Sequence, residues 1–259
     1  MIVSFKFHSG RSFKLVWLSL SLICTGCGDY LAALAKPAVT PSPEPAPTAV
    51  NNFMPPPDCG GRLEAGDRMY LELIHKMVER GNYHAALANL AQLQKQTGKV
   101  PQLDYLRAEA LRGAAQTDAA EAAYRALLNT CMAGQGWHGL GLLSADAGQL
   151  DKAEEFIGNA LAERPVAADY HNDFGMVSLL RGKFEPARQA FLTAIELDRN
   201  NSLPIENMVV LALLEHREAE AQGYIDFYKL TGEQADKLRR RARELSERQT
   251  ASDSTSTSE

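Results

Sequence analysis

The chain has 259 residues, of which 45% are hydrophobic and 23% charged, which is enough apolar material for one or two domains with a buried core. Its formal net charge is −5, and the basic residues do not gather on one face of a folded segment, which argues against nucleic acid as the main partner. Aromatic residues make up only 7% while alanine is abundant, a composition that favours closely packed helices over strands.

The N-terminal residues have the layout of an export signal. Lys6, Arg11 and Lys14 come first, with no acidic residue among the first fourteen. The apolar run LVWLSLSLI follows; at nine residues it is too short to cross a bilayer core, which needs about 20. This order of basic and apolar segments predicts a secretory signal peptide.

The end of this leader reads LICTGCGDY, with the small residues Thr25 and Gly26 directly before Cys27. It resembles the lipobox of bacterial lipoprotein precursors, although Cys24 stands where that family usually has Leu. The resemblance implies a signal peptide over 1–26 and a covalent lipid on Cys27, and the Gly after that cysteine implies the outer membrane. Plain secretion, an uncleaved anchor, and a redox or metal Cys-x-x-C are the alternatives, the last needing a folded context.

Residues 27–66 are expected to be the lipidated N-terminus and a tether. The stretch PAVTPSPEPAPTAVNNFMPPP, 37–57, holds eight of the twelve prolines, so it cannot form a helix interior or a core. We expect a semi-extended spacer that lets the body stand away from a membrane. A ligand for a proline-recognition domain is the alternative.

A 34-residue repeat follows the tether. The segment GQGWHGLGLLSADAGQLDKAEEFIGNALAERPVA, 134–167, matches the spacing of the tetratricopeptide pattern, with Ser144 in place of its Tyr. The matching residues are Trp137, Leu140, Gly141, Ala153, Ile157, Ala160 and Pro165. A shift of 34 turns Gly141 into Gly175 and Ile157 into Phe191. This resemblance implies helical hairpins stacked in a solenoid.

Marker alanines at the twentieth position count the repeats. They are Ala86, Ala120, Ala153, Ala187 and Ala221. We therefore predict an all-α tetratricopeptide solenoid over 67–235, with five repeats at 67–100, 101–133, 134–167, 168–201 and 202–235. Gly or Ala at the eighth position and Ala at the twentieth would let the two helices of a hairpin approach closely.

The end of a repeat stack needs a polar cap. The segment EQADKLRRRARELSERQ has helical composition, and Leu238 and Leu245 give it one thin apolar seam, so we predict a capping helix at 236–249. Its run Arg239, Arg240 and Arg241 is read as a solvated face, with a nucleic-acid patch as the alternative. Residues 250–259 are small and polar, and are predicted to be disordered.

Two cysteines remain if Cys24 leaves with the leader and Cys27 is acylated. An even pair in an exported protein suggests a disulfide between Cys59 and Cys131, which would close a loop of about 72 residues. The alternative is two separate thiols, with Cys131 acting as a small buried hydrophobe.

No catalytic or metal-binding motif is found, so we expect neither an enzyme nor a metal site, cofactor or small-molecule substrate; an unrecognised site is the alternative. The predicted function is protein binding. In such repeats, positions 2, 5, 9 and 12 of the first helices line a groove for a partner's helix or extended tail. The residues at positions 5 and 9 are Tyr105, Glu109, His138, Leu142, Asn172, Met176, Glu206 and Val210. They could instead pack between repeats. The groove lacks the lysines that clamp acidic C-terminal peptides.

Taken together, these segments resemble the tetratricopeptide lipoproteins of bacterial pilus assembly, in particular that of the tight-adherence (Tad/Flp) pilus. The stretches that carry the likeness include RAEALRGAAQTDAAEAAYRALL and YHNDFGMVSLLRGKFEPARQAFLTAIEL. The resemblance implies an outer-membrane pilotin, lipid-anchored at the periplasmic face, that binds a secretin subunit and assists its assembly. A general envelope scaffold, for peptidoglycan enzymes or outer-membrane protein insertion, is the alternative.

Overall fold

The computed structural model describes Cys59 and residues 63–256, with side chains up to Thr250. The chain divides into two units, residues 1–48 and 49–259, and every described residue belongs to the second. The predicted signal peptide, the lipidation site Cys27, nearly all of the tether and the last three residues therefore lie outside the described residues.

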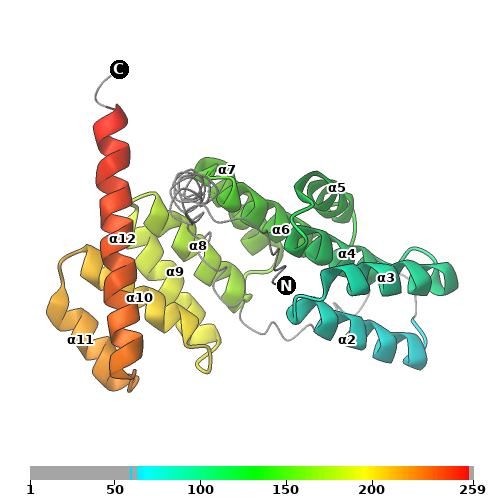
Figure 1. Ribbon diagram of the computed structural model, residues 1–259, viewed down its shortest axis with the longest axis horizontal. Coiled ribbons are helices and arrows are strands. Elements are labelled where there is room, and N and C mark those ends of the chain that lie inside the picture. The colour runs from blue at the N-terminus through cyan, green and yellow to red at the C-terminus, as the bar shows by residue number, and fades with distance from the viewer. Residues whose placement is uncertain (1–58, 60–62, 257–259) are drawn as a thin grey trace, which may run out of the picture. The chain divides into compact units, whose positions relative to one another are not determined.

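Within the described residues the chain forms eleven α-helices and no strand (Figure 1), which confirms the predicted all-α class. The helices are α2 (Ala65–Glu79), α3 (Tyr83–Thr97), α4 (Pro101–Gly113), α5 (Thr117–Leu127), α6 (Ala133–Asp146), α7 (Leu150–Glu163), α8 (Ala168–Leu180), α9 (Phe184–Leu197), α10 (Leu203–Leu214), α11 (Glu218–Phe227) and α12 (Gly232–Ser256). None of these described helices is both long and apolar enough to span a membrane.

The helices pack as consecutive hairpins. The pairs are α2–α3, α4–α5, α6–α7, α8–α9 and α10–α11, and each second helix packs against the first helix of the next pair. Each repeat covers the apolar side that its neighbour leaves open, as expected for a stack in which one hairpin cannot bury its own core.

Small residues set the spacing inside the hairpins, as the repeat pattern predicts. The five marker alanines are at most 1% exposed. A Cβ on Gly141 would collide with the side chain of Ile157, and a Cβ on Gly175 would lie 2.5 Å from Cε1 of Phe191. These glycines are therefore required where a first helix crosses the large side chain of its partner helix.

The turn inside each hairpin uses one left-handed residue. Gly81, Gly148 and Gly182 have φ of 76°, 72° and 69°. Ala115 and His216 occupy the same place in the second and fifth repeats, with φ of 56° and 57°. The same turn is therefore kept in these two repeats without glycine, although a side chain at such a φ is strained. A search for turn glycines alone would miss both turns.

The C-terminal helix differs from the prediction at both ends, since α12 runs from Gly232 to Ser256 instead of covering 236–249. It begins earlier because Thr231 and Gln234 form a reciprocal cap, in which the Thr231 N–H donates to Oε1 of Gln234 (2.8 Å) and the Gln234 N–H donates to Oγ1 of Thr231 (3.3 Å). It continues into the segment expected to be disordered because extending a formed helix costs far less than nucleating one.

Candidate partner-binding face

The eight predicted groove residues all lie on the first helices α4, α6, α8 and α10. We call the side of these helices that carries positions 5 and 9 of the repeats the first-helix face. The structure does not make it one uniform open groove. Part of it is occupied by contacts between repeats, and part by α12.

In the second repeat, Glu109 is engaged within its own hairpin. The hydroxyl of Tyr124 donates to Oε1 of Glu109 (2.5 Å), and Nη2 of Arg112 donates to Oε2 (3.0 Å). Burial alone would raise the pKa of Glu109, but the charge of Arg112 and these two hydrogen bonds lower it below its usual value. Burial, with Glu109 nearby, raises the pKa of Tyr105. Glu109 is thus an ionised group that ties α4 to α5.

In the third repeat, His138 links α6 to α8. Its Nε2 lies 2.8 Å from Oδ2 of Asp173, and its ring stacks on Tyr170 with centroids 4.2 Å apart. Burial opposes protonation, but the hydrogen bond and charge of Asp173, aided by Asp169 and Glu109, outweigh it and raise the pKa of His138 above its ordinary value. The folded chain therefore holds a proton on His138 more strongly than the unfolded chain does.

Asp173 starts a chain of hydrogen bonds that runs from His138 towards the C-terminus. Nδ2 of Asn172 donates to Oδ1 of Asp173 (3.1 Å), and Nδ2 of Asn207 donates to Oδ1 of Asn172 (2.7 Å). Nη1 of Arg241 then donates to Oδ1 of Asn207 (3.0 Å). We call these five residues the polar ladder; it connects α6, α8, α10 and α12.

The ninth positions show how the face changes along the stack. Leu142 and Met176 are half-buried, whereas Val210 is fully buried in a cluster that includes side chains of α12. Val210 therefore does not line an open surface, in contrast to the prediction, because α12 covers it.

Among the fifth positions, His138 and Asn172 are also buried, at 9% and 2% exposure, by their contacts with the next repeat. Glu206 is half-buried, and its Oε1 accepts a hydrogen bond from the Ser202 hydroxyl (3.4 Å).

Sequence reasoning missed three polar residues of this face. Asn207 directly follows Glu206, the fifth position of its repeat, and only the polar ladder shows that it belongs to this face. Gln102 and Gln135 stand at position 2 of their repeats, are 8% and 6% exposed, and each has an amide oxygen with no hydrogen-bond partner in the described part of the chain. Position 2 belongs to the groove pattern, so that pattern, applied in full, would have included both glutamines.

The basic run of α12 is divided among different surroundings. Arg239 donates to Asp236 (3.2 Å) and Gln222 (3.1 Å), Arg240 is exposed, and Arg241 enters the polar ladder. The three guanidinium groups therefore do not share one surface. Among the described residues no group of His, Cys, Asp and Glu is placed to hold a metal ion.

Cys59 and Cys131 are joined by a disulfide, with Cα atoms 5.2 Å apart and a sequence separation of 72. Cys59 is 6% exposed and belongs to a cluster with Ala108, Tyr124 and Met132. The bond fixes Cys59, which precedes the repeats, to the junction between α5 and α6.

No protein-family model matches the chain. The TPR repeat-containing protein PA4299 of Pseudomonas aeruginosa is 33% identical over 188 residues, covering 73% of this chain and 75% of that protein. The chain belongs to the tetratricopeptide-repeat proteins.

Two solved structures show the same fold. The thermophilic TPR protein TTC0263 of Thermus thermophilus has a TM-score of 0.56 at 20% identity, over 69% of this chain and 98% of that one. PilF of Pseudomonas aeruginosa has a TM-score of 0.57 at 20% identity, over 72% and 87%. Tetratricopeptide-repeat proteins are generally non-enzymatic scaffolds, and the fold suggests that this chain has protein partners.

Proposed function

We propose that this tetratricopeptide-repeat protein is a lipid-anchored assembly factor at the periplasmic face of the outer membrane. Its partner is the secretin subunit of a Tad/Flp-type pilus, which it binds and helps to localise and assemble. Cys27 carries the lipid, the proline-rich segment is the spacer, and the repeats hold the partner.

The observation that carries the proposal is the order of segments in one chain: an acylatable cysteine, a proline-rich spacer and a protein-binding stack of hairpins. At about 3.1 Å per residue, the spacer before Cys59 would let the body reach up to about 100 Å from the lipid. Two or more acyl chains give a stable anchor, so a triacylated Cys27 would hold a bound partner at the membrane.

The resemblance to the tight-adherence lipoprotein supports the choice of partner. On the first-helix face, Leu142 supports direct contact with it. This leucine is half-buried on α6 and is not part of the hydrophobic clusters found among the described residues. It is a suitable apolar contact for a helix or an extended segment laid on the face.

The test is to isolate outer membranes from cells carrying the wild-type protein, Cys27→Ser, Cys24→Ser or Leu142→Glu, crosslink them, and identify what co-purifies. We expect wild type and Cys24→Ser to recover a secretin. Cys27→Ser should reduce secretin multimers in the outer membrane, whereas Leu142→Glu should leave the protein anchored but recover less secretin.

Two results would contradict the proposal. If peptidoglycan enzymes or the protein-insertion barrel are recovered in place of a secretin, the chain is a general envelope scaffold. If Cys27→Ser stays in the outer membrane with normal secretin multimers, the lipid anchor is not the mechanism.

A further inference from the structure

The position of α12 departs from the pattern of the stack. Each earlier first helix packs on the second helix before it, as α10 packs on α9. By that rule α12 would pack on α11, but its backbone packs on α10 instead, as Figure 1 shows. It also reaches α8, where Nε2 of Gln249 donates to the Leu179 carbonyl oxygen (3.1 Å). α12 therefore lies on the first-helix face of the last two repeats and does not extend the stack.

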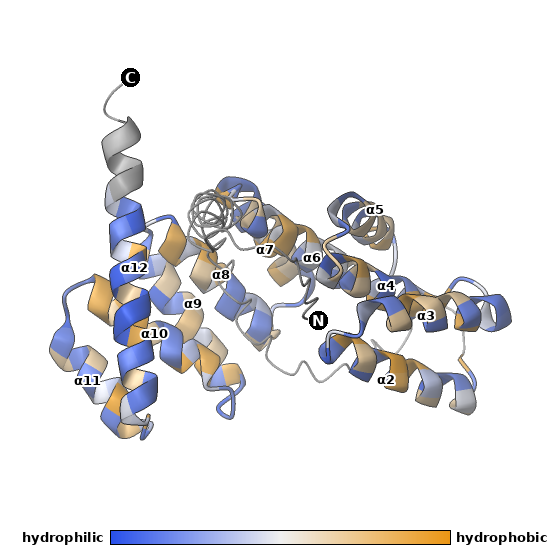
Figure 2. Ribbon diagram, viewed as in Figure 1, coloured by the Kyte–Doolittle hydropathy of each residue, from blue (hydrophilic) through white to orange (hydrophobic). Residues whose placement is uncertain are grey.

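The side of α12 that meets this face is narrow. Its buried side chains are Ala235, Leu238, Ala242 and Leu245, and most of the remaining helix is hydrophilic (Figure 2). Their spacings of three, four and three residues form one stripe along a helix. By contrast α10 is apolar around most of its circumference, with Glu206 and Asn207 as its polar residues, so its outer side needs a cover.

Arg241 supplies a second polar contact of this interface, beside that of Gln249. Its guanidinium reaches Oδ1 of Asn207 (3.0 Å) and Sδ of Met176 (3.5 Å), both on uncharged side chains. Burial lowers the pKa of Arg241, and Glu206 only partly opposes this. The end of the polar ladder thus needs a hydrogen-bond donor, and a donor from another helix could satisfy it equally well.

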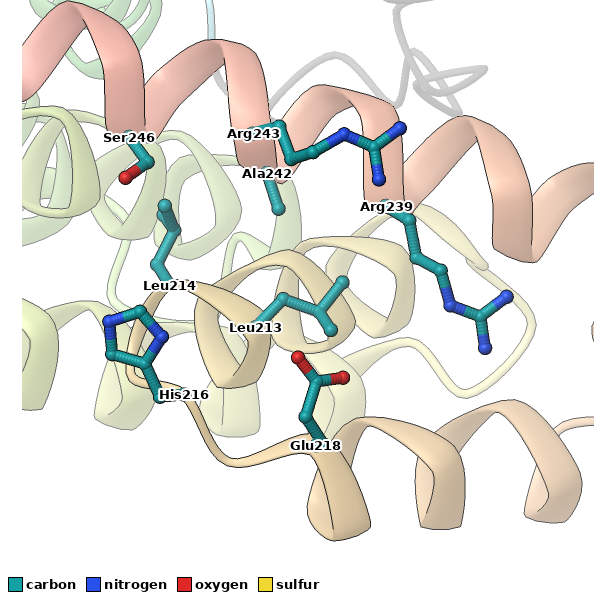
Figure 3. Close-up of a pocket in the computed structure, with 8 residues that line it drawn as sticks. All are labelled: Leu213, Leu214, His216, Glu218, Arg239, Ala242, Arg243 and Ser246. Carbon is teal, nitrogen blue, oxygen red and sulfur yellow. The ribbon is translucent and has the colours of Figure 1, made fainter.

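The fit of α12 to the repeats is incomplete. A pocket of about 260 Å³ remains between α12 and the end of α10, with Leu213 and Leu214 on one side and Ala242 and Ser246 on the other (Figure 3). The link from α11 is short, and its Lys229 has a left-handed φ of 54°. A displacement of α12 would require rotation within this link.

We propose that the face formed by α8 and α10 is a docking site for an amphipathic helix of a partner protein, and that α12 is its displaceable internal occupant. The partner helix carries small or leucine side chains at the spacing of the α12 stripe and a donor at the place of Arg241. The inference rests on the proposed binding function and deepens it by naming the face and the chemistry of the bound segment.

Displacement predicts how affinity responds to α12. The apparent dissociation constant equals the intrinsic one divided by the fraction of molecules with α12 released. Arg241→Glu places a carboxylate beside the Asn207 oxygen and Glu206, so it should release α12 while keeping all core leucines. Arg240→Glu makes the same charge change at an exposed position of the same helix and is the matched control.

The probe is a fluorescent synthetic peptide with the wild-type sequence of residues 232–250, titrated by anisotropy into the full-length protein in mild detergent. We expect Arg241→Glu to bind it at least about tenfold more tightly than wild type or Arg240→Glu. A peptide with Leu238→Asp and Leu245→Asp should not bind. Hydrogen exchange should become faster in α12 of Arg241→Glu and stay unchanged in α8 and α10 once the peptide is bound.

Other results overturn the proposal. If exchange shows α12 released but the peptide does not bind more tightly, the vacated face is not a helix site. If light scattering shows dimers that exchange α12, the occupant is a second copy and not a separate partner. Should both Arg241→Glu and Leu245→Ala unfold the last two repeats, α12 is an obligatory cap. None of these measurements involves a secretin, so the helix docking site can be refuted while the proposed function stands, and the reverse.

Discussion

Reduction of the Cys59–Cys131 bond gives the largest stability change that the structure predicts. The bond closes a loop over a sequence separation of 72, which covers the first two repeats. In the chain-entropy treatment, such a loop stabilises the fold by about 4 kcal/mol, because the crosslink restricts the unfolded chain. Substitution adds a packing loss to this figure, since Cys59 is buried beside Ala108 and Tyr124, whereas reduction alone does not.

Urea unfolding followed by circular dichroism measures the effect. The oxidised protein, the reduced protein and the double variant Cys59→Ala/Cys131→Ala are compared, and the last two should agree within about 1 kcal/mol. Repeat stacks can unfold in parts, so hydrogen exchange must locate the loss. We expect faster exchange in α2 to α5 and little change in α8 to α11.

Two observations would refute this reasoning. Two thiols that react in the native protein isolated from cells would mean that the bond is absent in the cell. A loss of less than about 1 kcal/mol on reduction, in a protein shown to be oxidised beforehand, would mean that the loop is already restricted in the unfolded state.

Three further predictions concern contacts within and between the repeats. Gly175→Ala should destabilise the protein by about 1–3 kcal/mol because the new Cβ meets the buried ring of Phe191. Gly158→Ala in α7 has open space around its Cβ and should stabilise the protein by about 1 kcal/mol. Urea unfolding of both variants measures the difference, and equal effects would contradict the packing argument. The pKa of His138 is higher in the folded chain than in the unfolded chain, so its charge stabilises the fold fully below the unfolded-state pKa, and this stabilisation is lost as pH rises through the folded-state pKa. His138→Gln should therefore lower the free energy of unfolding more at about pH 5.5 than at about pH 8.5. A loss that does not depend on pH would refute the role of the charge. His216→Gly removes the strain of the left-handed backbone and should stabilise the protein by up to about 1 kcal/mol, seen as a higher thermal midpoint. A lower midpoint would show that the contacts of the imidazole stabilise the fold by more than the strain destabilises it.

The repeats could be predicted from the sequence because the forces that define them are local. A Gly on a first helix and a large side chain sixteen residues later meet within one hairpin, as Gly175 and Phe191 do. The turn glycines and marker alanines likewise act within one repeat. The spacing of small and large residues therefore shows directly where two helices of one hairpin must approach closely, and the hairpins can be predicted from it.

The partner-binding face was less predictable because its side chains depend on the next repeat. Asn172 is buried by Asn207, and His138 by Asp173 and Tyr170, across contacts between successive repeats. A list of positions 5 and 9 treats every repeat alike and cannot register which neighbour supplies a partner. It therefore assigned to a groove several side chains that instead join one repeat to another.

The packing of α12 was the least predictable feature, and it divides the first-helix face into two parts with different requirements. Leu238 and Leu245 indicate an apolar seam, but their spacing cannot say whether the seam meets α11 or α10. Because it meets α10, a partner on α6 near Leu142 can bind with α12 in place, whereas a partner on α8 and α10 must first displace it. Secretin recovery distinguishes the two: Leu142→Glu reduces it in the first case, and Arg241→Glu increases it in the second.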